Sequence, residues 1–354
     1  MKSLEGADPI ARGPVVVRTD IGPETIDEWV HSHPAATGYH LSGWMTVVRR
    51  AFGHETLYLA AERGQRLVGL LPLVFFRSRV FGRCAVSMPF LNYGGVVADD
   101  AAAEEALLDR AVTETQRAGG SHLELRHTHQ HYGTLSAKRH KVAMRLPLPP
   151  TREQLWTQLD RKVRNQVRKG EKSELTVEQG GLELLDAFYR VFAHNMRDLG
   201  TPVYSRGFFQ AVLETFPSTS ALFVVRHQGR PVAASLVYWH GGMIEVPWAS
   251  ALREANPLCA NVFLYWHMLA FAADRGFATF DFGRSTPDEG TFHFKRQWGA
   301  EPLELVWEYW TGEGVPVPSV NPKNPKYRAA IRLWQHLPVP LATVLGPHIV
   351  RNIP

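Results

Sequence analysis

The chain has 354 residues, which at about 150 residues per domain predicts roughly two domains. Hydrophobic residues make up 45% and charged residues 21%, a balance that permits a sizeable core and excludes disordered, collagen-like and coiled-coil chains. The formal net charge of +5 is unevenly spread: residues 161–173 carry six Lys/Arg against Glu171, and residues 321–354 carry five Lys/Arg and no acid. Two basic segments therefore stand on a slightly acidic body.

Cysteine usage and hydropathy favour a soluble protein of the reducing cytoplasm. Cys84 and Cys259 are too far apart in sequence to indicate a disulfide framework or a metal knuckle. Residues 1–13 lack the apolar core of a secretion signal. The longest apolar stretch, 67–76, is 10 residues, whereas about 20 are needed to span a bilayer. A peripheral position at the inner face of the membrane stays open.

The first half of the chain shows an ordered series of predicted elements. Residues 40–53 predict a helix, and 57–76 predict a hairpin, because two apolar runs flank a polar, glycine-containing turn. A strand with an internal proline follows at 86–95, then an Ala-rich helix at 101–118 and a strand at 121–127.

The second half repeats this order, which indicates an internal duplication. A helix is predicted at 205–216, a hairpin at 221–239 and a proline-interrupted strand at 244–252. A helix at 261–274 and a strand at 277–284 follow.

One further strand is predicted to close each half, at 141–149 and at 304–310. The order predicts an α/β fold, with helices packed on mixed sheets, built from two domains in tandem. We expect the domains at 1–150 and 151–312, followed by a basic, proline-containing segment at 313–354. Proline removes a ladder donor, so both proline-containing strands are expected at an edge or a bulge. Such bulges often lie beside active sites, although a shared constraint of the fold explains the match equally well.

The basic segment 161–173 follows a helix start predicted at Thr151. Its cations are suited to clamping the phosphates of a nucleotide-bearing substrate or RNA. The alternative is a solvated helix surface that forms salt bridges with the acidic body. The basic segment lacks the interleaved aromatic residues of RNA-binding segments, and we expect no DNA partner. The candidate substrate-binding residues here are Lys162, Arg164, Arg168 and Lys169.

Residues 280–302 are the segment most suited to chemistry, because ligands of open α/β domains lie at strand ends and in the loops after them. Lys295 returns beside the strand and could stabilise an oxyanion or a phosphate. Asp281 could orient this lysine or accept a proton. Alternatively, Asp281 caps the turn and Lys295 is an ordinary ion-pair partner of Asp288 or Glu301.

Further candidates lie on neighbouring segments. Glu245 stands in an otherwise apolar strand and is a candidate base, whereas Trp248 binds substrate or belongs to the core. Arg197 and Tyr204 either line a pocket or form a loop wedged under the sheet. The remaining substrate-binding candidates are Asn261, Arg284 and Ser285.

Four histidines, His122, His127, His129 and His131, resemble a metal site at first sight. Their pattern lacks accompanying Cys or Asp residues, so we expect a strand and its surface loop, and no metal site. A glycine P-loop, a dinucleotide fingerprint and a GxSxG motif are also missing from the sequence, which argues against a tightly bound nucleotide cofactor and against α/β-hydrolase chemistry.

Several long strings, taken together, resemble the FemAB family of the GNAT acyltransferase superfamily. They are SMPFLNYGG, KVRNQVRKGEKS, NMRDLGTPVYS, EVPWASALRE and FDFGRSTPDEGTFHFKRQWGAEP. The chain is most similar to the FemAB-like proteins of bacterial exosortase (PEP-CTERM) and exopolysaccharide loci. The resemblance implies two GNAT-like domains and transfer of an acyl or aminoacyl group to an amine. In the family, cations at the start of the second domain and a lysine near its end contact phosphates or the reacting carbonyl. Residues 164–169 and Lys295 match them.

Departures from the family pattern affect the donor and the acceptor. In family members of known function, the donor is aminoacyl-tRNA and the acceptor is a peptidoglycan precursor. This sequence lacks the long helical arm of some tRNA-dependent members. It also lacks the CoA-cradling pattern [RQ]xxGx[GA], in whose place residues 253–261 stand. The first half has no counterpart of the Lys295 loop in residues 122–133, so we expect it to bind substrate rather than to carry the chemistry.

Three functions follow as expectations. The first is an acyltransferase, aminoacyltransferase-like, that modifies an amine of a nucleotide- or lipid-linked peptidoglycan, exopolysaccharide or other envelope precursor. The second is an acyl-CoA-dependent N-acyltransferase acting on a small molecule or a sugar amine. The third is a non-catalytic adaptor that uses residues 326–350 at an anionic membrane surface. The alternative for that segment is packing on the body of the protein.

Overall fold

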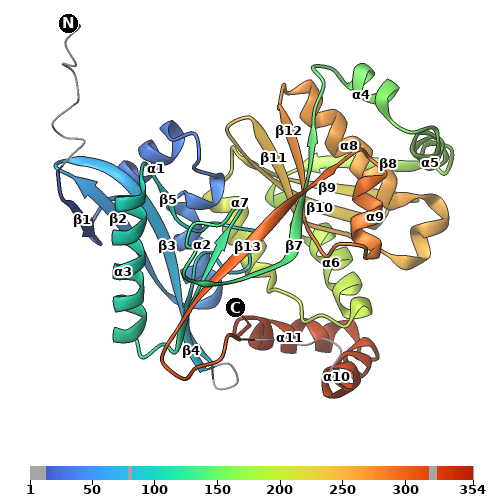
Figure 1. Ribbon diagram of the computed structural model, residues 1–354. Helices are drawn as coiled ribbons and strands as arrows, with labels where there is room; N and C mark the ends of the chain where they lie inside the picture. Colours follow the sequence, from blue (N-terminus) through green and yellow to red (C-terminus); the bar gives the residue numbers. More distant parts are fainter. Residues whose placement is uncertain (1–12, 79–81, 319–324, 354) are drawn as a thin grey trace, which may run out of the picture.

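The computed structural model describes residues 13–78, 82–318 and 325–353, with residues 325–328 described by their backbone alone. The sequence expectation for the N-terminal segment 1–12 lies outside this range. The described strands form one mixed sheet of 13 strands, strongly twisted and covered by helices on both sides (Figure 1). The order across the sheet is β1-β2-β3-β4-β6-β13-β7-β12-β11-β10-β9-β8, with β5 beside β3.

The first half contains the elements up to residue 147. They are β1 (Val15–Arg18), α1 (Pro23–Ser32), α2 (Gly43–Phe52), β2 (Glu55–Arg63), β3 (Arg66–Ser78), β4 (Gly82–Val86), β5 (Val97–Ala98), α3 (Ala101–Arg117), β6 (His122–His127) and β7 (Ser136–Pro147). Gly64, at φ 67°, makes the turn of the predicted hairpin β2–β3.

The elements of the second half begin with two helices that the first half lacks, and then follow the order of the first half from a strand that pairs with the hairpin as β1 does. They are α4 (Arg152–Gln158), α5 (Arg161–Lys172), β8 (Leu175–Gly180), α6 (Leu185–Leu199), α7 (Arg206–Thr215), β9 (Ser220–His227), β10 (Arg230–His240), β11 (Met243–Ala251), α8 (Ala260–Asp274), β12 (Thr279–Ser285), α9 (Gly290–Arg296) and β13 (Glu301–Thr311). Helices α10 (Pro325–Gln335) and α11 (Val339–Val350) follow.

The predicted duplication is confirmed by the parallel strand pairs. In the first half β4 pairs with β6 in parallel, ending with Val86 beside Glu124. In the second half β11 pairs with β12 in parallel, ending with Glu245 beside Asp281. Each pair is preceded by an antiparallel hairpin and connected by one helix, α3 or α8. The two halves are therefore repeats of one mixed α/β unit.

The closing strands differ from the sequence expectation, because they are exchanged between the halves. Strand β7 pairs with β12 of the second half, and β13 pairs with β6 of the first half. The two exchanged strands also pair with each other, so they run side by side through the centre of the molecule (Figure 1). Each half is thus completed by the last strand of the other.

The proline-containing segments behave differently in the two halves. Pro247 lies in β11, where three steps from Glu245 to Trp248 oppose two steps from Leu236 to Tyr238 of β10, which is the bulge that proline favours. The predicted strand at 86–95 is wrong beyond Val86. Met88 and Phe90 have φ values of 42° and 71°, which a strand cannot contain, and the segment forms turns.

Three hydrophobic clusters hold the sheet and helices together. The largest spans both halves, and in it Tyr39 and Trp44 of the first half pack against Tyr238 of the second. A second cluster lies under α8, and a third lies under α3. Because the largest core is shared, the two halves form one packed body, and the space between them is where polar groups of both meet.

Candidate active site

The best candidate site lies where β11 and β12 separate. The two strands are paired only as far as Glu245 and Asp281, so the two carboxylates stand side by side at the last paired position. Their side chains are fully buried, with exposed fractions of 1% and 0%. An acidic pair in an otherwise apolar region needs compensating partners, because an isolated buried charge is unstable.

Those partners come from the first half of the chain. The Tyr93 hydroxyl, from the loop after β4, donates to Glu245 Oε2 at 2.8 Å and lies 3.4 Å from Asp281 Oδ2. Arg145 of β7 donates through Nε to Asp281 Oδ2 at 3.1 Å and through Nη2 to the Tyr93 hydroxyl at 3.1 Å. The Arg145 side chain is 29% exposed, so it connects the carboxylates with solvent.

The burial of Glu245 changes its protonation. Removal from water, followed by the negative charge of Asp281, raises the pKa of Glu245 to about 8, against the opposing effect of the Tyr93 hydrogen bond. At neutral pH Glu245 is therefore mainly a neutral acid, while Arg145 faces Asp281. Two carboxyl groups with different partners can give and take a proton near neutrality.

Lys295 reaches this region from α9. Its Nζ donates to the backbone carbonyls of Gly283 and Arg284, each at 3.0 Å. Burial lowers its pKa to about 8, while Asp281 acts in the opposite direction. Neither alternative ion-pair partner, Asp288 or Glu301, contacts it among the described residues. Lys295 therefore fixes the backbone that follows Asp281.

The backbone between Asp281 and Arg284 adopts a conformation that requires glycine. Gly283 has φ 75°, and a Cβ atom there would lie 2.8 Å from the Val246 carbonyl oxygen. Its N–H donates to Asp281 Oδ1 at 2.8 Å. Asp281 thus caps this turn, as one alternative held, and also belongs to the carboxylate pair.

Arg284 lies between the two halves without a carboxylate partner among the described side chains. Its guanidinium is 5.3 Å from the centre of the Trp307 ring, which Arg126 also approaches, at 4.3 Å. Burial and the charge of Arg126 lower the pKa of Arg284 to about 10. Its Nη1 and the hydroxyl of Ser285 are both buried without a hydrogen-bond partner. Unsatisfied donors of this kind favour an anionic or polar ligand.

The predicted basic segment forms α5, a helix separate from α4. Val163, Val167 and Gly170 face inward, and Gly170 lies directly against Phe263 of α8. The basic side chains are left on the outer surface. Two shallow hollows of about 540 and 490 Å³ meet at Lys162.

One hollow includes Lys169 and the other includes Arg296 of α9. Helix α9 therefore carries Lys295 inward and Arg296 outward to the basic surface. Arg168 lies 5.5 Å from the Trp156 ring centre, and Arg164 is half-buried on the same helix. The basic residues thus line a surface that α9 connects to the buried pair.

The remaining predicted residues lie in other surroundings. Arg197 donates to the Leu337 carbonyl and pairs with Asp198, so it holds the C-terminal segment rather than lining the site. Tyr204 and Trp248 pack within the shared aromatic core, which supports the alternatives of a wedge and a core residue. Asn261 lies in the first turn of α8.

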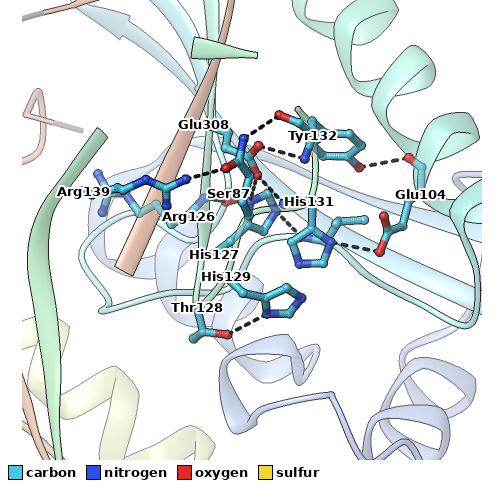
Figure 2. A network of polar contacts seen from close by, with 12 residues as sticks. Ser87, Glu104, Arg126, His127, Thr128, His129, His131, Tyr132, Arg139 and Glu308 are labelled. Carbon is cyan, nitrogen blue, oxygen red and sulfur yellow. Dashed lines mark hydrogen bonds and ion pairs between the residues drawn. The ribbon is translucent and has the colours of Figure 1, made fainter. Parts of the chain in front are cut away.

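The strand and loop expected for the histidines are confirmed, with His122 and His127 on β6 and His129 and His131 in the loop after it. The surface position is wrong for His122 and His127, which are 6% and 2% exposed, and of the four only His129 is exposed. Figure 2 shows Glu308 of β13 facing His127, with His131 close by between His127 and Glu104. Among the described residues, no group of three or more His, Cys, Asp or Glu side chains is placed to hold a metal ion.

This network is closed upon itself. Glu308 accepts the His127 Nδ1–H at 2.9 Å and the backbone N–H groups of His131 and Tyr132 at 2.9 and 2.8 Å. The other His127 nitrogen accepts the N–H of Val96 at 3.0 Å. His127 is thereby fixed as a neutral ring, and burial lowers its pKa. One nitrogen of His127 thus holds the loop after β4, and the other holds Glu308 of β13.

Sequence reasoning did not identify Tyr93, Arg145 or Glu308 as site residues. Tyr93 and Glu245 are 152 positions apart, and Arg145 acts on the second half only because β7 is exchanged. The signal that was available for Tyr93 is its place in the SMPFLNYGG string, a turn-forming segment between two strands.

Comparison with known proteins finds a family model that matches part of the second half. Residues 158–296 match the family model described as an acetyltransferase (GNAT) domain. The matched residues include Glu245, Asp281 and Lys295. No curated protein matches the chain.

Solved structures resemble the fold over most of the chain. A crystal structure of FemX matches with a TM-score of 0.66 and 16% identity, covering 83% of this chain and 96% of that one. The C-terminal domain of a putative lysylphosphatidylglycerol synthetase from Agrobacterium fabrum gives 0.55 and 14%, covering 80% and 90%. A tandem GNAT protein from the clavulanic acid biosynthesis pathway gives 0.53 and 12%, covering 86% and 99%. The duplicated α/β fold is thus that of tandem GNAT proteins.

Proposed function

We propose that the protein transfers an aminoacyl or acyl group to an amine of a phosphate-bearing envelope precursor, either nucleotide-linked or lipid-linked. The observation that carries the proposal is the buried Glu245–Asp281 pair, at the point where β11 and β12 separate within a GNAT domain. The two carboxyl groups share one tyrosine hydroxyl, and Glu245, whose pKa burial raises to about 8, can give and take a proton near neutrality, which is what proton transfer between an amine and a leaving group requires.

The chemistry follows from these groups. The acceptor amine attacks the donor carbonyl carbon, a C–N bond forms, and the C–O or C–S bond to the leaving group breaks. Protonated Glu245 supplies a proton through the Tyr93 hydroxyl to the departing oxygen or sulfur. The proton released by the amine then returns to Glu245, so the site ends as it began. Arg145 bonds both Asp281 Oδ2 and the Tyr93 hydroxyl, and so holds the two groups in place.

Phosphate recognition is assigned to the surface of α5 and α9. Lys162, Lys169 and Arg296 present cations with no ion pair among the described residues, and α9, which carries Arg296, also carries the buried Lys295. Such cations bind the phosphates of tRNA, of CoA or of a nucleotide-linked acceptor. The names of two structural neighbours, FemX and lysylphosphatidylglycerol synthetase, favour an aminoacyl donor.

A direct assay distinguishes the donors. The protein is incubated with either charged tRNA or acyl-CoA, together with envelope precursors that carry an amine, and products are identified by mass spectrometry. We expect product with charged tRNA, and loss of product in the variant Lys295→Ala and in the double variant Arg164→Ala, Lys169→Ala. A matched control removes two exposed cations at the far edge of the sheet, Arg18→Ala and Arg66→Ala. If product forms from acyl-CoA alone, the donor is acyl-CoA and not charged tRNA. If the site variants form as much product as the unmodified protein, the proposed site is rejected.

The pH dependence tests the role of Glu245 separately. Because its pKa is about 8, the group is protonated below pH 8 and loses its proton above it. We expect kcat to be level below this pH and to fall as pH rises through it. In Glu245→Gln the residual rate should lack that fall, and a fall that persists in this variant would assign it to another group, such as Lys295.

A further inference from the structure

Large hydrophobic side chains that face solvent gather in one short part of the molecule. Among the described residues nine such side chains are exposed, and six of them lie in residues 333–353. They are Leu333, Leu341, Val344, Leu345, Ile349 and Ile353. A gathered group of exposed apolar side chains marks an interaction surface, whereas scattered ones need no explanation.

Helix α11 is packed with its small residues inward. Ala342, Gly346 and Val350 are its buried residues, and Gly346 lies so close to the backbone of Val203 that a Cβ atom would be 2.8 Å from the Val203 nitrogen. The larger residues, including Val344 at 63% and Leu345 at 41% exposure, point away from the protein. Burial on the body therefore does not explain them.

The C-terminal segment is held in a fixed orientation. Arg197 Nη1 donates to the Leu337 carbonyl at 2.9 Å, and Gln335 Nε2 donates to the Asp198 carbonyl at 3.1 Å. At its end, His54 Nε2 bonds the Arg351 carbonyl at 2.7 Å. Figure 1 shows α10 and α11 together along one side of the molecule. The apolar face is thus presented by a docked element.

Charge identifies the partner that fits this face. Residues 321–354 contain five Lys/Arg and no acid, and residues 333–350 contain no Lys, Arg, Asp or Glu. Arg332 and Arg351 are exposed at the two ends of this uncharged stretch. An apolar centre bordered by cations matches a bilayer with anionic headgroups. Among the described residues no helix is long and apolar enough to span the membrane, so the contact is with its surface.

A hollow of about 1110 Å³ adjoins the apolar face. Its walls include Phe75, Ile331, Trp334, Ile349 and Ile353, and Ile349 also belongs to the exposed face. Arg77 and Arg351 contribute cations to the same hollow, and Arg77 is paired with Glu55. The apolar surface thus continues from α11 into a space whose walls carry both apolar side chains and cations, the two features that suit an amphiphile.

We propose that α10 and α11 dock the protein on a bilayer surface that contains anionic phospholipid, with the outer side chains of α11 in the interfacial layer. The docking is independent of the acyl transfer proposed above, because it uses none of the residues of the candidate active site. The segment 321–354 thereby has a role that the transfer chemistry does not give it.

The test uses the full-length protein and sedimentation with vesicles of phosphatidylcholine, with and without phosphatidylglycerol. We expect binding to the mixed vesicles. The double variant Val344→Ser, Leu345→Ser should lower the partition coefficient roughly tenfold or more, because apolar area is lost from the interface. The double variant Arg332→Gln, Arg351→Gln should lower it roughly tenfold on the mixed vesicles alone.

The matched control is Val16→Ser, Leu182→Ser, which removes two equally exposed apolar side chains elsewhere and should leave binding unchanged. Thermal unfolding of the serine variants checks that they are folded. The proposal is overturned if the unmodified protein stays in the supernatant with both vesicles, or if Val344→Ser, Leu345→Ser binds as well as it does. Sedimentation velocity that shows a dimer dissociated by these two substitutions would assign the face to a second copy instead.

Discussion

The two halves place different chemistry at the same point of one fold. Where β11 and β12 separate, Glu245 and Asp281 form a buried acidic pair, and Arg284 nearby has no ion pair within the described part of the chain. At the equivalent point of the first half, Val86 replaces the first acid, and Glu124 is neutralised by Arg126 at 2.7 Å.

The segment after β4 also fills the first-half position. Ser87 Oγ accepts the Arg126 N–H, the Gly94 N–H donates to the Arg126 carbonyl, and the Val96 N–H donates to His127. The bonds close the first half and bring Tyr93 to the carboxylates of the second. One repeat thus keeps reactive, incompletely satisfied groups, while the other uses its polar groups to hold a residue for its partner. A duplication allows this division because only one of the two copies has to carry the reactive groups, while the other supports them.

The largest expected difference between the two halves comes from replacing one acid of each half in turn, Glu245 and Glu124. Glu245→Gln should lower kcat/KM by about 10²–10⁴, the usual effect of removing a general acid or base. Glu124→Gln should lower it about threefold or less, because that residue pairs with Arg126 and touches no reacting group in the proposed chemistry. Steady-state kinetics measures both. Equal losses in the two variants would show that the halves share the chemistry.

The closed network of the first half predicts a large effect on stability. Glu308→Ala leaves His127 and two backbone N–H groups without their acceptor in a buried site, and should reduce the free energy of unfolding by about 3–5 kcal/mol. Glu104→Ala is the control, because that carboxylate is partly exposed and bonds His131, and it should cost about 1 kcal/mol. Urea unfolding measures the difference, and similar values for both would contradict a structural role for Glu308.

Acid should weaken the first half through its buried histidines. Burial lowers the pKa of His40 to about 4, below its ordinary value of 6.5. Above pH 6.5 both folded and unfolded states hold it neutral. As pH falls from 6.5 to 4, only the unfolded state gains the proton, and stability falls by about 3 kcal/mol at most.

Urea unfolding between pH 7.5 and 4 tests this contribution. His40→Gln should show a shallower loss of stability on acidification than the unmodified protein. His129→Gln, at an exposed position, should show the same loss as the unmodified protein. An unchanged slope in His40→Gln would reject the assignment.

The smallest expected effect concerns the glycine in the turn after Asp281. Gly283→Ala and Gly276→Ala both place alanine at positive φ, 75° and 73°, which costs about 1 kcal/mol. Only Gly283 faces a backbone atom within reach, the Val246 oxygen, so its substitution should cost about 1–3 kcal/mol more and should also reduce activity. Thermal unfolding and initial rates measure both effects. Equal losses in the two variants would show that the close approach of Gly283 to the Val246 oxygen does not matter.

Much of the fold could be predicted because local signals decide it. The hairpins follow from glycine turns between apolar runs, and the helices α3, α7 and α8 follow from composition and spacing. The segment 86–95 was mistaken for a strand because its apolar residues match one, while tertiary hydrogen bonds from β6 hold it in turns. The exchange of β7 and β13 could not be predicted, because pairing partners far apart in sequence are chosen by the assembled sheet.

The site residues that could be predicted are those that carry a charge within an apolar strand, because such a charge is unusual. Glu245 and Asp281 stand out for that reason, and the structure places them together. Lys295 was found, but its bonds to two backbone carbonyls depend on the conformation at Gly283. Tyr93 carries no such signal, since an aromatic residue in a turn is common and its contact with Glu245 arises only when the halves meet.

The exchanged strands have a consequence for the order in which the protein is made. Strand β6 is complete at His127, but its free edge is covered only by β13, which ends at Thr311. During synthesis this edge therefore stays open while well over a hundred further residues are added, and an open edge invites pairing with another chain. The same topology means that a break between β7 and α4 yields two fragments that each hold the other's missing strand, so they should acquire structure together and not separately.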